Sequence, residues 1–144
     1  MKKFLLAFMF VFIIGFLHPI SANSQTHYYR TTEFSYKQLT NNGKWTSWSD
    51  WEESDMLVSM NLSNDVVVIF SPQTQRYKIT QHVRNYTDTS GGKQAEYKFI
   101  DQDGDKGSMR LRVEKNGNYQ LYIEFSDIMW VYNIKQISNI DGYQ

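Results

Sequence analysis

Three tryptophans, Trp45, Trp48 and Trp51, recur at every third position in a segment that becomes acidic. Exposed indole rings could stack on sugar rings or on a partner protein, and the neighbouring carboxylates could hydrogen-bond hydroxyl groups. In an extended strand Trp45 and Trp51 would share one face and Trp48 would lie on the other. The structural alternative is that Trp45 and Trp51 close one end of the fold, since burying a large aromatic side chain is stabilising. We expect Trp45 to be structural, and the candidate ligand-binding residues are Trp48, Trp51 and, further along the chain, Tyr86.

Three aspartates, Asp101, Asp103 and Asp105, alternate with other residues in a glycine-containing turn and could supply oxygen ligands to a cation. The run resembles the start of an EF-hand calcium loop. It departs from that loop at position six, where glycine is replaced by Lys106, and at position twelve, where a bidentate glutamate is replaced by Arg112. The segments on either side are also expected to be strands rather than helices. We therefore predict a solvated hairpin turn that binds no metal.

Catalytic chemistry finds little support in the residue types present. Apart from one histidine near the N-terminus, the chain has only His27 and His82, and neither belongs to a nucleophile, zinc or carboxylate motif. The sequence has no cysteine, no Gly-x-Ser-x-Gly elbow and no glycine-rich phosphate loop. A pair of carboxylates acting in a cleft stays open as an alternative. We predict a protein that is not an enzyme and that has no cofactor.

The N-terminus is typical of an export signal. Lys2 and Lys3 precede an apolar run over residues 4–17, which is short for a membrane span, and small residues follow at Ala22 and Ser24. These features predict a signal peptide over residues 1–24, with cleavage after Ala22 or Ser24, and a single domain over residues 25–144. The mature protein would be secreted or periplasmic, with no membrane segment after cleavage and no disulfide to support its core.

The charge balance argues against one class of partner. Without Lys2 and Lys3, the 15 basic residues fall to 13 against 15 acidic residues, a net charge of −2. Nucleic-acid binding rests on many lysine and arginine contacts to phosphate, so no nucleic-acid partner is expected.

Residues 97–134 predict four consecutive strands, because apolar and polar side chains alternate along most of this stretch. A three-residue loop at 115–117, with Gly117 in the left-handed conformation, sets the apolar faces opposite each other; a two-residue loop would set apolar against polar. A two-residue turn at 126–127 brings the same face inwards. The expected partners are Val113 with Tyr119, Leu111 with Leu121, Met109 with Ile123, Phe125 with Ile128, Ile123 with Trp130, Leu121 with Tyr132, and Tyr119 with Ile134.

The whole domain is predicted to be all-β, since no stretch shows helical periodicity over three turns. Gly43-Lys44-Trp45 resembles the Gly-x-Trp signature of lipocalins, although it follows a long strand instead of opening the first one, and only Lys135 lies near the end where lipocalins have an arginine. The resemblance implies a small exported barrel that holds an apolar ligand. We predict a single antiparallel meander of about eight strands closing into a lipocalin-like barrel, with a two-sheet sandwich as the alternative.

These observations favour an exported barrel that binds a small apolar or amphipathic ligand, or a glycan, in or at the mouth of the barrel. The alternative is an interaction module, such as an inhibitor of an exported enzyme, that presents the loop at 86–94. That loop contains Ser90-Gly91, as in the Ser-Gly-x-x-Tyr loop of barrels that inhibit lysozyme, but has Gln94 where tyrosine should be. A cavity would favour the first hypothesis and a filled core the second. The side chains expected to line a cavity or fill the core are Met56, Met60, Tyr97, Phe99, Met109 and Trp130.

Overall fold

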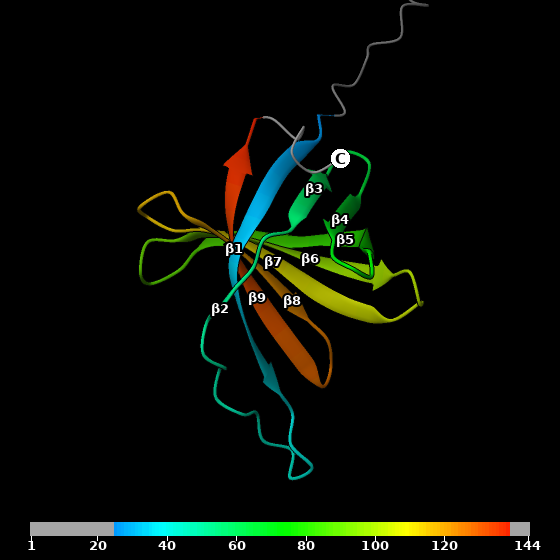
Figure 1. Cartoon of the computed structure of the whole chain (residues 1–144), viewed down its shortest axis with the longest axis vertical. Helices are drawn as coiled ribbons and strands as arrows, with labels where there is room; N and C mark the ends of the chain where they lie inside the picture. The colour runs from blue at the N-terminus through cyan, green and yellow to red at the C-terminus, as the bar shows by residue number, and fades with distance from the viewer. Residues whose placement is uncertain (1–24, 139–144) are drawn as a thin grey trace, which may run out of the picture.

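The computed structural model describes residues 25–138, so the predicted signal peptide lies outside the described residues. Within this range all regular secondary structure is β-strand (Figure 1). The strands are β1 (His27–Gln38), β2 (Glu52–Glu53), β3 (Leu57–Asn61), β4 (Val66–Phe70), β5 (Gln75–Thr87), β6 (Lys93–Asp101), β7 (Lys106–Val113), β8 (Tyr119–Glu124) and β9 (Ile128–Ile137).

The strands form one antiparallel meander that closes on itself. Each strand from β3 to β8 pairs with the next one along the chain, β3 pairs with β1, and β9 returns to pair with β1 on its other side. The short strand β2 lies beside the second half of β1 as an extra strand outside the eight-stranded cycle. The predicted all-β barrel is confirmed, and the chain does not form the alternative two-sheet sandwich. Closure pairs strand edges that an open sheet would leave exposed.

Both predicted hairpin registers are confirmed. Leu111 lies opposite Leu121 across the first turn, and Leu121 lies opposite Tyr132 across the second. Gly117 has φ 89°, and its N–H donates to the carbonyl of Glu114. The three-residue loop therefore forms because it keeps the apolar side chains of three strands on the same inner face.

The barrel interior is filled by side chains. Phe99, Met109, Leu121 and Ile123 are each at most 2% exposed, at the centre of a single apolar cluster. Of the six side chains expected to line a cavity or fill the core, Met60, Phe99 and Met109 belong to this cluster, and Met56, Tyr97 and Trp130 pack against it. The interior is thus a packed core, and the clefts considered below lie at its ends and on its outer wall.

The segment over residues 39–56, which we call the return segment, turns back after β1 and runs along the outside edge of that strand, at the bottom of Figure 1. The N–H groups of Thr46, Ser49 and Ser54 donate to β1 carbonyls at 2.8, 2.8 and 3.0 Å. The contacts are spaced several residues apart, so only β2 qualifies as a strand here. This return segment covers the half of β1 that β3 does not reach.

Candidate functional site

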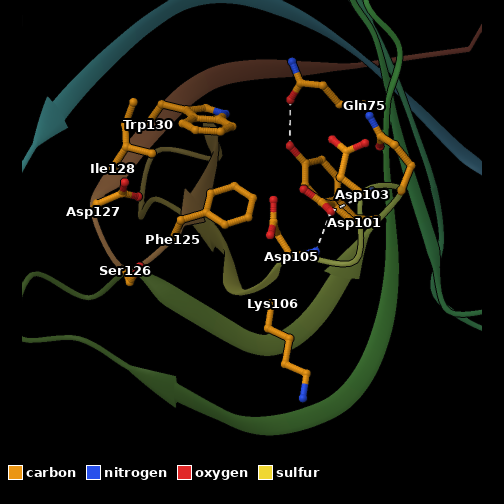
Figure 2. Close-up of a pocket in the computed structure, with 12 residues that line it drawn as sticks. Gln75, Asp101, Asp103, Asp105, Lys106, Phe125, Ser126, Asp127, Ile128 and Trp130 are labelled. Atoms are coloured by element: carbon orange, nitrogen blue, oxygen red, sulfur yellow. Dashed lines mark hydrogen bonds between the residues drawn. The ribbon is translucent and has the colours of Figure 1, made fainter.

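A cleft of about 560 Å³ lies at one mouth of the barrel, where the β4–β5, β6–β7 and β8–β9 turns meet (Figure 2). The meander brings these three turns together because alternate connections of an up-and-down barrel end on the same side. The cleft is lined by Gln75, Tyr77, Asp101, Gln102, Asp103, Asp105, Lys106, Phe125, Ser126, Asp127, Ile128 and Trp130.

One wall of the mouth cleft is aromatic and continues into the core. The ring of Phe99 packs edge-on against Tyr77 and Phe125, with centroids 4.7 and 5.4 Å apart, and Phe125 lies 5.6 Å from Trp130. Burial raises the pKa of Tyr77 well above its usual value, and the Tyr77 hydroxyl donates a hydrogen bond to Gln75 Oε1 at 2.7 Å. The aromatic wall is held rigidly by the core beneath it.

The opposite wall carries carboxylates. Asp101 uses Oδ1 to accept the backbone N–H groups of Asp103 and Asp105, both at 2.9 Å, so it holds the turn in shape. Asp103 and Asp105 are exposed on this wall, and Asp127 is exposed on the side of Phe125 and Ile128, whereas Figure 2 shows the Lys106 side chain directed away from the cleft. Among residues 25–138, no three histidine or carboxylate side chains are grouped so as to hold a metal ion. The mouth therefore combines an apolar wall with negative charge.

The tryptophan segment lies on the outer wall, not at the mouth. Trp45, Trp48 and Trp51 are 38%, 40% and 47% exposed, so the expectation that Trp45 closes one end of the barrel is wrong. The reason is that the return segment follows the outside of β1, while inward-facing side chains of the barrel strands already fill the core. The Lys37 ammonium lies 5.5 Å from the Trp45 ring and 4.9 Å from the Trp48 ring, so these two indoles share one cation. Trp48 also meets the edge of Tyr122, with centroids 6.2 Å apart.

Trp51 lies at a second cleft, of about 460 Å³, on the outer face of β1, β8 and β9. Polar side chains of these strands, among them Glu33, Gln120 and Asn133, make up much of its lining. None of them stands out in the sequence, because each is a single polar residue at an outward position of a strand.

Tyr86, the third predicted ligand-binding residue, lies apart from Trp51. Its ring is covered by the guanidinium of Arg84 at 4.4 Å, and its hydroxyl donates to Glu96 at 3.2 Å. Tyr86 lines a different cleft, between β5 and β7, and so the structure does not bring the predicted residues into one site.

Asp88 is a polar centre that sequence reasoning missed. Its Oδ1 accepts hydrogen bonds from the N–H and hydroxyl of Ser90 and from Gly92 N–H, and its Oδ2 accepts from Gln94 and Arg112. The hydrogen bonds from Ser90 and then from Arg112 lower the pKa of Asp88 well below its usual value. The spacing Asp-x-Ser-x-Gly could have indicated an Asx turn here. The loop between β5 and β6 is therefore rigidly braced.

The two histidines of the described residues make local contacts. His82 stacks on Tyr97, with centroids 4.9 Å apart, and its Nε2 hydrogen-bonds Asn85 at 2.8 Å. Nδ1 of His27 lies 3.3 Å from the amide of Gln136. Neither histidine is hydrogen-bonded to a carboxylate or to a hydroxyl that would serve as a nucleophile.

Comparison with protein-family models, curated proteins and solved structures finds no match to this chain. Among residues 25–138 there is also no helix long and apolar enough to cross a membrane.

Proposed function

We propose that this protein is an exported, non-enzymatic binding protein that takes a small amphipathic ligand, positively charged at one end, at the mouth of its barrel. The observation that carries this proposal is the composition of the mouth cleft, which has a volume of about 560 Å³. In it the rings of Phe125 and Trp130 face exposed aspartates. An apolar body would pack on the rings, and a cationic head would meet both the carboxylates and the aromatic faces.

The filled interior favours the interaction hypothesis over a ligand held inside the barrel, and it leaves the mouth as the place for a small ligand. Side chains such as Phe99 and Leu121 occupy the centre and are almost completely buried. Placing an apolar ligand among them would require the core to be repacked, which costs about 1–3 kcal/mol even for added methylene groups. The mouth cleft needs no such change.

The experiment is isothermal titration with a matched pair of amphiphiles, decyltrimethylammonium and decyl sulfate, below their micelle concentrations. We expect the cation to bind and the anion to bind at least ten-fold more weakly, with the affinity for the cation falling as salt is added. The double variant Asp103→Asn/Asp105→Asn should lose at least ten-fold in affinity for the cation, about 1.4 kcal/mol.

A charge-matched control removes two carboxylates elsewhere. Glu52 and Glu53 form the exposed strand β2 on the outer wall, so Glu52→Gln/Glu53→Gln should leave affinity within two-fold. Equal binding of the two amphiphiles, or equal effects of the two double variants, would contradict the proposal.

A second candidate function is supported by the braced loop between β5 and β6. A loop that is already fixed in one conformation loses less conformational entropy when it binds a partner. Inhibitory loops use this advantage. Asp88 provides that bracing, while Thr89 at the tip is exposed. If the loop inserts into an enzyme such as a lysozyme, the wild-type protein should inhibit it stoichiometrically and Thr89→Arg should not.

A further inference from the structure

A row of hydrogen-bonded side chains crosses the outer face of four neighbouring strands. Arg112 of β7 donates from Nη1 to Gln120 Oε1 at 3.2 Å, Gln120 of β8 donates from Nε2 to Asn133 Oδ1 at 3.0 Å, and Asn133 of β9 donates from Nδ2 to Glu33 Oε2 on β1 at 3.0 Å. We call these four residues the polar ladder. Its members come from positions up to 100 residues apart, and barrel closure brings them together.

The polar ladder fixes the orientation of both amide groups. Gln120 Oε1 accepts from Arg112 and from the Tyr122 hydroxyl, which turns its NH₂ group towards Asn133. Asn133 is oriented in the same way, with its oxygen towards Gln120 and its NH₂ group towards Glu33. Each NH₂ group keeps a second N–H, and Glu33 keeps its second carboxylate oxygen. The face therefore presents two N–H donors and one carboxylate acceptor whose directions are set in advance.

Trp51 provides an aromatic surface beside this row. It is 47% exposed and lines the 460 Å³ cleft together with Glu33, Gln120 and Asn133. Among the described residues, none stacks on the Trp51 ring or places a cation over it, in contrast to Trp45 and Trp48, which share Lys37. The ring is thus open to a ligand on the side of the cleft.

The charges around the cleft are mixed. Glu33 and Lys135 both line the cleft, and the carboxylate of Glu114 is already paired with Arg112 at 3.0 Å. Such a balance offers no net attraction to a strongly acidic or basic ligand. It suits a neutral ligand that is rich in hydroxyl groups.

We infer that the cleft beside Trp51 is a carbohydrate-binding site for a neutral oligosaccharide. One apolar face of a sugar ring would lie on the indole, and adjacent hydroxyls, each able to donate and accept, would bond the free N–H groups of Gln120 and Asn133 and the free oxygen of Glu33. An apolar ligand would leave these polar groups unpaired, at a cost in affinity. This inference concerns a different surface from the mouth cleft and does not depend on the proposed function.

The test is a titration of the mature protein with maltohexaose, cellohexaose, xylohexaose and mannohexaose, monitored by ¹H–¹⁵N NMR. The chain has four tryptophans, so four indole N–H signals can be assigned by single substitutions. At least one hexasaccharide should shift the Trp51 indole and the side-chain amides of Gln120 and Asn133, and an acidic oligogalacturonate should bind at least ten-fold more weakly than that hexasaccharide.

Two substitutions in the same segment serve as site variant and control. Trp51→Ala should weaken binding at least ten-fold, and Trp51→Phe should restore part of the affinity. Trp45 is another exposed tryptophan of this segment, and Trp45→Ala should leave the affinity within two-fold of wild type. The mouth variant Asp103→Asn/Asp105→Asn should also leave it within two-fold. Absence of binding by all four sugars at 10 mM, or binding that Trp51→Ala does not change, would overturn the inference, whatever the outcome for the mouth.

Discussion

The guanidinium of Arg112 donates from Nε to Asp88 Oδ2 at 2.9 Å, and each side chain is only 18% exposed. This pair joins the loop between β5 and β6 to the outer face of β7. Arg112 also donates from Nη2 to Ser90 in the same loop at 2.9 Å, and from Nη1 to Gln120. A single arginine therefore links the braced loop to the polar ladder.

The Asp88–Arg112 pair predicts a pH dependence of stability. Because hydrogen bonds from Ser90 and Arg112 hold the pKa of folded Asp88 below that of the unfolded chain, about 3.9, the carboxylate stabilises the fold fully above that value. Its contribution is lost progressively as pH falls from about 3.9 towards the lower pKa of the folded state. Urea unfolding of wild type and Asp88→Asn between pH 2 and pH 7 should show the variant less stable near neutrality and the difference shrinking in acid. A difference that stays constant down to pH 2 would contradict this assignment.

Two glycines should lose stability for different reasons when a side chain is added. Gly107 lies in β7 opposite Phe99, and a Cβ there would lie 2.5 Å from the ring and 2.5 Å from the carbonyl oxygen of Glu124. Gly117 has φ 89° but open space around it. Gly107→Ala should therefore cost about 3 kcal/mol through overpacking, and Gly117→Ala about 1–2 kcal/mol through backbone strain.

A rescue variant separates the two causes in the glycine prediction. Asparagine tolerates the left-handed conformation, so Gly117→Asn should recover most of the loss seen in Gly117→Ala, whereas Gly107→Asn should be as damaging as Gly107→Ala. Chemical denaturation measures all four variants. A Gly117→Ala variant less stable than Gly107→Ala would show that space around Gly107 is not the limiting factor.

The hydroxyl of Thr31 should anchor the return segment to the barrel. Thr31 is fully buried, and its Oγ1 accepts Met56 N–H at 2.8 Å and hydrogen-bonds Ser54 at 2.8 Å. Thr31→Val keeps the volume but leaves these partners unpaired, so it should destabilise by about 1–3 kcal/mol and speed amide exchange at Met56. Thr40→Val, which removes an exposed hydroxyl bonded to the Lys44 carbonyl, is the matched control and should stay within about 0.5 kcal/mol.

Two tryptophans distinguish core from surface. Trp130 packs on Phe125 against the core, so Trp130→Ala should cost about 3 kcal/mol. Trp48 is 40% exposed and mainly contacts Lys37 and Tyr122, so Trp48→Ala should cost no more than about 1 kcal/mol, the value of an exposed cation–π contact. Acrylamide quenching of single Trp→Phe variants should show Trp48 to be more accessible than Trp130; the reverse order would exclude this arrangement.

The hairpins and the core face can be predicted from the amino-acid sequence alone. Leu121 has the same neighbours in the structure as in the prediction, because a period of two and a glycine in the turn leave one register in which apolar side chains face each other. These are local signals, read within about ten residues on either side of a turn. About eight predicted strands, several with one apolar face, also predict a barrel that closes around a core. The pairing of β1 with β9 confirms this closure.

The surfaces on which a ligand could bind depend on how the strands come together in the folded protein. The residue type of Trp45 predicts a core position, but Trp45 lies on the outer wall because other side chains already fill the interior. Asn133 meets Glu33 only because β9 closes on β1, and an irregularity between Thr31 and Glu33 shifts the register of that pairing. Outward polar side chains carry no pattern that names their partners, since those partners depend on which strands become neighbours and in what register. The candidate sites therefore follow from barrel closure, which no local stretch of the sequence specifies.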